Sequence, residues 1–212
     1  MPGLIVAGAG GHAGMVIDTV RALGHFEVVG LIGQEGQPHD TAHGLPIIGT
    51  DKSLPRLFAE GISAAANGVG SVKDNGPRRQ VYETLKSAGF SLPTLIHPRA
   101  WVADSARLGE GVQVMPGALV LRAVTIGNNT LINSGAIVEH DSRIGAHVHI
   151  CTGVRMGGQV TIGDGGFIGV GTSVRQSVRI GAGALVGAGS VVIDDVADGA
   201  FVAGVPAREV RS

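Results

Sequence analysis

An aliphatic residue occupies every sixth position of the chain from Leu108 to Val192. The apolar face of an α-helix returns every 3.6 residues and that of an ordinary strand every second residue, so neither element has this period. A six-residue period is typical of a parallel β-helix, in which short units bury one face by stacking on their neighbours. The pattern therefore predicts a β-helix in the second half of the chain. The positions in phase are Leu108, Val114, Val120, Ile126, Ile132, Val138, Ile144, Ile150, Met156, Ile162, Ile168, Val174, Ile180, Val186 and Val192.

A slower period of eighteen residues predicts the number of sides of this β-helix. A glycine directly follows the aliphatic residue in every third repeat. Because glycine adopts backbone conformations that strain other residues, we expect one corner of each coil to need it. Each coil should then have three sides and close after eighteen residues. These glycines are Gly109, Gly127, Gly145, Gly163 and Gly181.

The first part of the chain has another pattern, in which short apolar runs alternate with segments of helical character. Strands are predicted by the apolar runs at residues 4–7, 27–32 and 62–67. Helices are predicted by spacing and boundary signals at residues 13–23, 55–60 and 78–88. This alternation is typical of a small, Rossmann-like α/β domain with a parallel sheet. We therefore place an α/β domain in residues 1–95 and the β-helix with a C-terminal tail in residues 96–212.

Composition and charge narrow the function classes. A net charge of −1 at pH 7 creates no field that would attract nucleic acid or an anionic membrane surface. The single cysteine, Cys151, excludes a disulfide framework, and the chain has neither a signal peptide nor a long uninterrupted apolar run. We therefore expect a cytoplasmic protein with no nucleic-acid partner and no membrane insertion.

A glycine-rich segment between the first strand and the first helix is a candidate phosphate site. Such a turn presents backbone N–H groups and a helix N-terminus to an anion, here at Gly10, Gly11 and His12. A dinucleotide site would also need an acidic residue at the end of the second strand, where the chain has Gly33 and Gln34. A nucleoside diphosphate therefore fits better than NAD, and a structural turn without a ligand is the alternative.

His140 is the candidate catalytic base. It comes two residues after the inward Val138 and should therefore be exposed, with Glu139 and Asp141 on either side of it. A carboxylate beside a histidine can fix its tautomer, which suits a general base. Gly158 lies one coil further on and, with Gly157, should leave a slot beside the imidazole. The alternative is a solvated surface histidine without a role.

Five segments together carry a resemblance to a known family. They are residues 8–12, 96–100, 133–141, 144–150 and 204–208, with the sequences GAGGH, IHPRA, NSGAIVEHD, IGAHVHI and GVPAR. In these segments the chain resembles the bacterial nucleotide-sugar N-acetyltransferases, whose relatives include sialic acid O-acetyltransferases. The resemblance covers nearly the whole chain, and it implies that the β-helix is left-handed.

The resemblance also implies partners and roles for individual residues. It implies a homotrimer that binds acetyl-CoA between neighbouring β-helices and a nucleotide-linked amino sugar on the N-terminal domain. His140 would take a proton from the sugar amine, and Asp141 would orient the imidazole ring. The substrate-binding residues would be Gly10, Gly11, His12, Asn133 and Glu139. The residues lining the coenzyme would be His149, Gly158, Val170, Pro206 and Arg208.

The nucleobase and the reaction leave alternatives open. Relatives that bind UDP usually carry acidic residues after the second strand, whereas this chain has Gly33, Gln34 and Glu35. GDP-perosamine, whose sugar is a 4-amino-4,6-dideoxy sugar used in surface polysaccharides, is therefore the first candidate, and a UDP-linked sugar is the second. O-acetylation of a sugar hydroxyl and a non-catalytic sugar-nucleotide-binding scaffold are further alternatives. A zinc enzyme like the γ-class carbonic anhydrases would need three converging histidines, which the spacing of His140, His147 and His149 does not favour, so no metal is expected.

Overall fold

The computed structural model describes residues 1–34 and 41–210 of the chain. Met1–Val72 with Gly76–Leu95 form one compact unit, and Lys73–Asn75 with Ile96–Ser212 form another. Glu35, which bears on the choice of nucleobase, lies outside the described residues. Within the described ranges, no helix combines the length and the apolar character that crossing a membrane requires.

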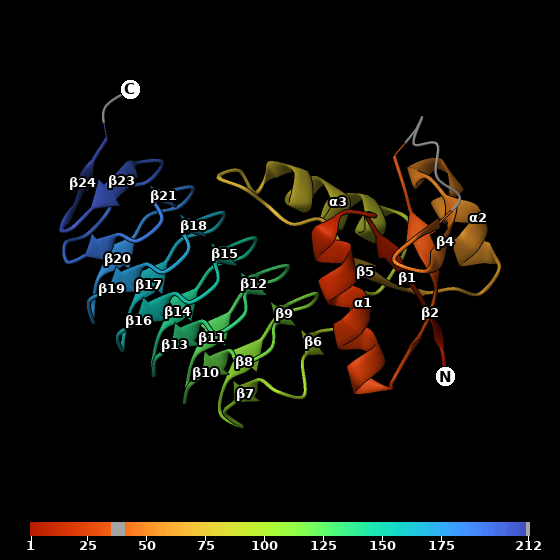
Figure 1. The fold of residues 1–212 in the computed structure, drawn as a ribbon, viewed down its shortest axis with the longest axis horizontal. Helices are drawn as coiled ribbons and strands as arrows, with labels where there is room; N and C mark the ends of the chain where they lie inside the picture. Colours follow the sequence, from red (N-terminus) through yellow and green to blue (C-terminus); the bar gives the residue numbers. More distant parts are fainter. Residues whose placement is uncertain (35–40, 211–212) are drawn as a thin grey trace. The chain divides into compact units, whose positions relative to one another are not determined.

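A five-stranded sheet in the order β3-β4-β2-β1-β5 forms the centre of the first unit (Figure 1). Its strands are β1 (Gly3–Ala7), β2 (Glu27–Ile32), β3 (Thr41–Ala42), β4 (Leu45–Gly49) and β5 (Ala64–Asn67). β1 pairs in parallel with β2 and β5, and β2 pairs in parallel with β4. β3, however, pairs antiparallel with β4. The parallel pairing expected for the predicted strands is therefore confirmed, but β3 makes the whole sheet mixed rather than parallel.

The β3–β4 hairpin is the element that the apolar pattern does not predict. Pro46 interrupts the apolar run of β4, and proline has no N–H to donate to a strand ladder. The two residues between the strands are His43 and Gly44, with φ of 51° and 72°. Two successive positive φ angles are typical of a type I′ turn, whose twist matches that of paired strands.

Helices α1 (Gly11–Leu23), α2 (Leu54–Ala59) and α3 (Gly76–Ser87) complete the first unit, with a 3-10 turn at Asp51–Ser53. The buried face of α1 includes Ala13, Val16 and Val20, at the spacing that the sequence predicts. Gly24 ends this helix with a φ of 66°, and its N–H donates to Val20 O at 3.1 Å. The first helix thus begins at the carboxyl end of β1 and has the predicted C-terminal glycine.

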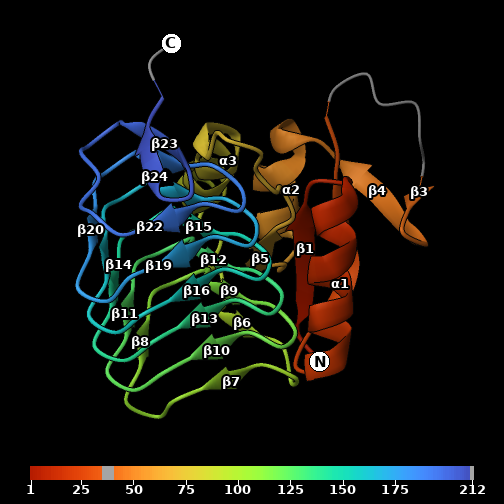
Figure 2. The ribbon, with the colours of Figure 1, turned by 60° about the vertical axis from the view of Figure 1, so that its left-hand side comes forward.

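Strands of mostly two residues build the second unit as a parallel β-helix (Figure 2). The first side holds β7 (Trp101–Val102), β10 (Leu119–Val120), β13 (Ile137–Val138), β16 (Arg155–Met156), β19 (Ser173–Val174) and β22 (Val191–Val192). The second side holds β8 (Arg107–Leu108), β11 (Thr125–Ile126), β14 (Arg143–Ile144), β17 (Thr161–Ile162) and β20 (Arg179–Ile180). The third side holds β6 (Leu95–Ile96), β9 (Gln113–Val114), β12 (Leu131–Ile132), β15 (His149–Ile150), β18 (Phe167–Ile168), β21 (Leu185–Val186), β23 (Phe201–Gly204) and β24 (Ala207–Glu209).

The register confirms the three-sided coil of eighteen residues. Val120 pairs with Val138, and Ile126 pairs with Ile144, so each strand lies beside the one eighteen residues further on. The aliphatic residue of each repeat is the second residue of its strand and is buried, as at Val138, except for the half-buried Leu108. Lys73–Asn75 belong to this unit, in which Asn75 Nδ2 donates to the carbonyl oxygens of Gly165 and Gly166 at 3.1 and 3.0 Å.

Glycine occurs every eighteen residues for a different reason from the one that the sequence suggests. Gly127 and Gly163 do not have a positive φ, whereas nearby corner residues such as Asn129 do, at 56°. A methyl group on Gly127 or Gly163 would instead lie 2.5 Å from the backbone nitrogen of Ala146 or Ala182 in the next coil. These glycines are therefore required by the close approach of stacked coils rather than by backbone freedom.

Candidate functional site

His140 and Asp141 lie at a corner of the coil, between β13 on the first side and β14 on the second. The corner residues that follow the first side form a column, here called the first corner: Arg122–Ala123, His140–Asp141, Gly158–Gln159, Gln176–Ser177 and Asp194–Asp195. Asp141 N–H donates to Arg122 O at 3.0 Å, and Gln159 N–H donates to His140 O at 2.8 Å. The backbone that carries His140 is thus held by the coils before and after it.

The imidazole of His140 contacts the carboxylate of Asp141, with Nδ1 at 2.9 Å from Oδ2. An ionised carboxylate only accepts hydrogen bonds, so Nδ1 carries the hydrogen and Nε2 presents its lone pair when the ring is neutral. The two side chains are 51% and 46% exposed, which leaves Nε2 accessible to a substrate. This geometry suits a general base whose tautomer is fixed by its neighbour.

Of the two carboxylates that flank His140, only Asp141 reaches the ring. Glu139 is half-buried, and its Oε2 accepts a long hydrogen bond of 3.4 Å from the backbone N–H of His140. The expectation of a carboxylate on either side of the imidazole is therefore wrong for Glu139.

Gly158 makes room for the imidazole itself. A methyl group there would lie 2.6 Å from Cε1 and 2.7 Å from Nε2 of His140. The expected slot beside the histidine is therefore occupied by its own ring. Gly157 cannot supply an oxyanion donor, since its N–H already donates to Val174 O at 2.9 Å. The backbone N–H of Gly158 is the better candidate for that role.

Asn133 and His149 form a second group on the third side of the coil. Asn133 Nδ2 lies 3.3 Å from Nε2 of His149. The His149 ring is buried and packs edge-on against Phe167, with ring centroids 5.2 Å apart. Val170 follows β18 at the end of the same side and is 54% exposed. Within one chain, these residues are separated from His140 by the first side of the coil.

The C-terminal tail returns to the first corner. Arg208 lies in β24, which pairs antiparallel with β23, and its Nη1 is 3.2 Å from Oδ2 of Asp194. Asp194 is three coils from His140 in the same column, about 14 Å away at ~4.8 Å per coil. Pro206 lies in the short turn between β23 and β24. The tail therefore places Arg208 at the far end of the column that carries His140.

The glycine-rich turn of the first unit has open space where the sequence predicts an anion. A methyl group on Gly10 or Gly11 would meet no atom of the described residues within 4 Å. Gly8, in contrast, has a φ of 116°, and a methyl group there would lie 3.1 Å from the carbonyl carbon of Gly68. Gly8 is thus a structural glycine, whereas Gly10 and Gly11 at the start of α1 have space on the side where a Cβ would lie. His12 lies beside Gly70, where a methyl group would be 3.2 Å from its Cβ.

Arg78 holds the neighbouring loop and was not found by the sequence analysis. Its fully buried guanidinium donates to the carbonyl oxygen of Val69 at 2.8 Å and to that of Asn67 at 3.4 Å. Asn67 Nδ2 in turn donates to Arg78 O at 2.8 Å. Burial lowers the pKa of Arg78 to about 9, so the side chain stays charged at neutral pH. In the sequence, an arginine at the start of a helix gives no sign of burial.

The other chemical candidates do not assemble into a site. His140 lies at the first corner, His147 at the next corner beside Asn129, and His149 on the third side, so the three rings do not converge. Among the described residues, no three metal-binding side chains form a cluster. Burial raises the pKa of the Cys151 thiol to about 12, which leaves it protonated and unreactive at neutral pH.

Comparison with known proteins identifies the family. Residues 3–85 match the family model described as PglD N-terminal domain, and residues 105–140 and 123–158 match the model of the bacterial transferase hexapeptide (six repeats). Perosamine N-acetyltransferase from Caulobacter crescentus, solved with CoA and GDP-perosamine as a histidine-to-asparagine variant, superposes with a TM-score of 0.93. The two sequences are 38% identical over 100% of this chain and 98% of that chain. The chain belongs to the PglD-type hexapeptide acetyltransferases.

Two further structures extend the PglD-type comparison. The acetyltransferase domain of PglB from Neisseria gonorrhoeae, in complex with acetyl coenzyme A, is 36% identical over 98% of each chain, with a TM-score of 0.89. WeeI from Acinetobacter baumannii shares the fold at 24% identity, with a TM-score of 0.84 over 99% of this chain and 100% of that chain. No curated protein matches the chain. The family resemblance carried by the five sequence segments is confirmed.

Proposed function

We propose that the protein transfers the acetyl group of acetyl-CoA to the amino group of a nucleotide-linked 4-amino-4,6-dideoxy sugar. GDP-perosamine is the first candidate substrate, because the perosamine N-acetyltransferase that is 38% identical to this chain was solved with it. The observation that carries the proposal is the contact between His140 and Asp141 above Gly158. Residues 1–95 would bind the nucleotide sugar, and residues 96–212 would form the acetyltransferase domain.

The proposed reaction uses His140 as a general base in a direct transfer. Nε2 takes a proton from the sugar amine while the amine nitrogen attacks the thioester carbonyl carbon, and Asp141 holds the protonated ring. The carbonyl oxygen becomes an oxyanion, to which the Gly158 N–H can donate. When the C–S bond breaks, the CoA thiolate leaves and takes the proton from His140. No acetyl-enzyme is needed, in agreement with the unreactive thiol of Cys151.

The proposed binding residues follow from the family and fit their surroundings. The N–H groups of Gly10, Gly11 and His12 would bind the diphosphate at the start of α1, where no side chain blocks the approach to the two glycines. Asn133 and Glu139 would contact the sugar. The coenzyme would contact His149, Gly158, Val170, Pro206 and Arg208.

A homotrimer of left-handed β-helices would make this coenzyme site possible. His140 and Val170 lie at different corners of the β-helix and in different coils, so a coenzyme that contacts both is best placed between two neighbouring chains. Closed threefold packing also avoids open-ended growth. Sedimentation at micromolar concentration should give a trimer, and a monomer alone would contradict the shared coenzyme site.

The test is an acetylation assay with two nucleotide sugars. Purified protein is incubated with acetyl-CoA and either GDP-perosamine or a UDP-linked 4-amino sugar, and free CoA and the acetylated product are measured. We expect CoA release only when both substrates are present, with the product carrying its acetyl group on nitrogen. Titration with GDP and with UDP then identifies the nucleobase. No CoA release and no binding of either nucleotide would overturn the proposal.

A further inference from the structure

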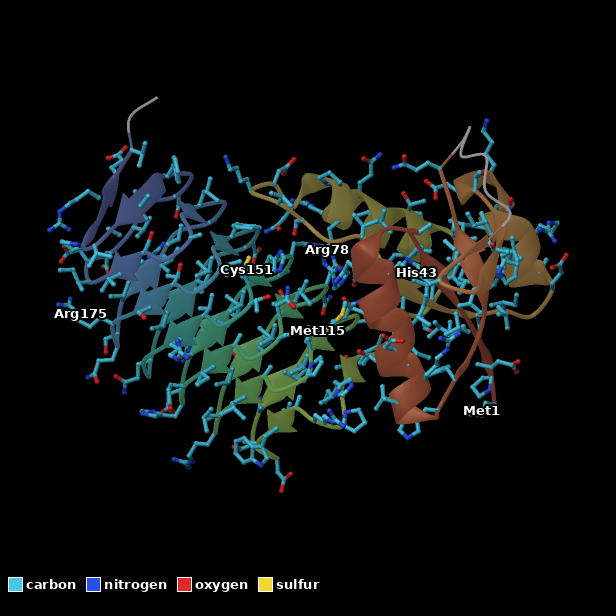
Figure 3. The ribbon with its side chains drawn as sticks, in the orientation of Figure 1. Met1, His43, Arg78, Met115, Cys151 and Arg175 are labelled. Carbon is cyan, nitrogen blue, oxygen red and sulfur yellow. The ribbon has the colours of Figure 1, made fainter. Side chains whose placement is uncertain are left out.

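His43, at the tip of the β3–β4 hairpin, lies against the glycine-rich turn (Figure 3). Its Nε2 is 3.0 Å from Gly10 O and 3.2 Å from Ala9 O. Both oxygens are backbone carbonyls that can only accept hydrogen bonds, so Nε2 must carry a hydrogen that it shares between them. His43 is exposed, and no residue role described above accounts for this contact.

The ring of His43 packs against Gly14 of α1. A methyl group on Gly14 would lie 3.0 Å from Nδ1 and 3.1 Å from Cε1 of His43. Glycine inside a helix costs about 1 kcal/mol relative to alanine. At this position the missing side chain lets the imidazole approach the first turn of the helix. The left-handed φ of His43, 51°, orients the hairpin tip toward that turn.

The contact bears on the orientation of two peptide groups. One of them is also held by the helix, because Gly10 O accepts the Ala13 N–H at 3.0 Å, whereas His43 is the printed partner of Ala9 O. In a trans peptide the C=O of one residue and the N–H of the next point in opposite directions. The carbonyl oxygens of Ala9 and Gly10 therefore belong to the same planar groups as the N–H of Gly10 and the N–H of Gly11. Because the two oxygens face the ring of His43, the N–H groups of Gly10 and Gly11 are aimed away from that ring.

We propose that His43 is a positioning residue for the nucleotide diphosphate: it fixes the peptide plane between Ala9 and Gly10 and supports the next plane, which the Ala13 N–H also holds, so that the N–H groups of Gly10 and Gly11 face the phosphates. This inference rests on the proposed function, because it assumes that these N–H groups bind the nucleotide sugar. His43 acts through the backbone and does not itself contact the ligand.

The first test separates the hydrogen bond from the shape of the hairpin. His43→Asn keeps a residue that tolerates positive φ but is too short to place a donor at the position of Nε2. His43→Gln places its amide nitrogen close to that position. We expect His43→Asn to weaken GDP or UDP binding about 3- to 10-fold, the usual effect of one lost hydrogen bond, and His43→Gln to restore most of it. kcat and the KM for acetyl-CoA should not change.

The second test displaces the ring from the opposite side. Gly14→Ala should weaken nucleotide binding by a similar factor, because its methyl group pushes His43 away from the turn. The same change should raise Tm, since alanine favours the helix. In the His43→Asn background, Gly14→Ala should still raise Tm but cause no further loss of binding.

Binding of GDP and UDP to each variant is measured by calorimetry beside the wild type. If the wild type binds a nucleotide and His43→Asn binds it equally well, the role of His43 is overturned while the proposed function stands. Equal losses from Gly14→Ala in both backgrounds would also overturn it, since the effect would not pass through His43. If the wild type binds neither nucleotide, the proposed function fails and the role of His43 falls with it.

Discussion

Glycine serves different purposes in the glycine-rich turn of the first unit and in the stacked coils of the β-helix. In the first unit a methyl group on Gly10 would meet open space, whereas in the β-helix a methyl group on Gly127 would meet the backbone of the next coil. At the first corner a methyl group on Gly158 would meet the imidazole of His140. Gly10 thus has space that a ligand can use, whereas Gly127 is required by the fold and Gly158 by a side chain. The residue type alone does not distinguish these cases.

In the proposed reaction, the turn at Gly10 serves substrate binding, and the corner at His140 serves the chemical step. Changes to the turn at Gly10 should alter the affinity for the nucleotide sugar. Changes to the corner at His140 should alter the rate of acetyl transfer. The predictions below test this division, beginning with the change of largest expected effect.

Replacement of His140 should have the largest effect. His140→Asn keeps a side chain of similar size but removes the proton acceptor, so kcat should fall by roughly 10²- to 10⁴-fold. The KM for acetyl-CoA should change little, because the lost interaction acts on the transition state. Steady-state kinetics with both substrates varied measure this. Asp141→Asn should cost less, and near-normal kcat for His140→Asn would exclude His140 as the base.

Gly158→Ala should have the next largest effect on kcat. Its methyl group would lie 2.6 Å from Cε1 of His140, so the ring must move. Displacement of a catalytic group by about 1 Å can cost 10²-fold in rate, and we expect up to that loss in kcat. In the His140→Asn background the same change should cost much less, because there is no imidazole to misplace. Full loss in both backgrounds would indicate that the missing side chain of Gly158 provides space for the coenzyme rather than for the imidazole.

The sequence predicts the repetitive part of the structure well, because each coil of the β-helix depends on local spacing. The eighteen-residue register follows from aliphatic and glycine periods that every coil repeats. The pairing of His140 with Asp141 can likewise be predicted from the sequence, since the two residues are adjacent. The position of the His140 ring over Gly158 cannot be predicted from the sequence, because it depends on a side-chain rotamer rather than on the repeat.

The contacts that the sequence does not predict join residues that are far apart in the chain. His43 contacts Gly10 from the β3–β4 hairpin. The apolar pattern does not predict this hairpin, because Pro46 interrupts the apolar run of β4. Arg78 is buried although its sequence context is that of a surface helix, since its partners are backbone carbonyls of another loop. A carbonyl acceptor has no sequence signature, so such contacts have no local signal to find.

Gly10→Val tests the binding side of the comparison. The position is open, so the folded protein should accept the larger side chain, but the diphosphate should not approach. We expect the affinity for the nucleotide sugar to fall roughly 10-fold, equivalent to about 1.4 kcal/mol, with acetyl-CoA affinity nearly unchanged. Gly8→Ala is the control, because a φ of 116° makes it lower Tm instead. Equal loss of both ligands from Gly10→Val would contradict the division between the two units.

Arg208→Ala should have the smallest effect and tests whether the tail belongs to the coenzyme site. Arg208 and Asp194 form an exposed ion pair at 3.2 Å, and such pairs contribute about 0–1 kcal/mol to stability. Tm should therefore hardly change, while the KM for acetyl-CoA should rise roughly 3-fold if the guanidinium attracts a coenzyme phosphate. Asp194→Asn is the matched variant: it frees Arg208 from its partner and removes a negative charge, so the KM should stay equal or fall. Because both side chains are exposed, added salt should shrink the difference between Arg208→Ala and the wild type. An unchanged KM in Arg208→Ala at low salt would exclude Arg208 from the coenzyme site and limit that site to residues nearer His140.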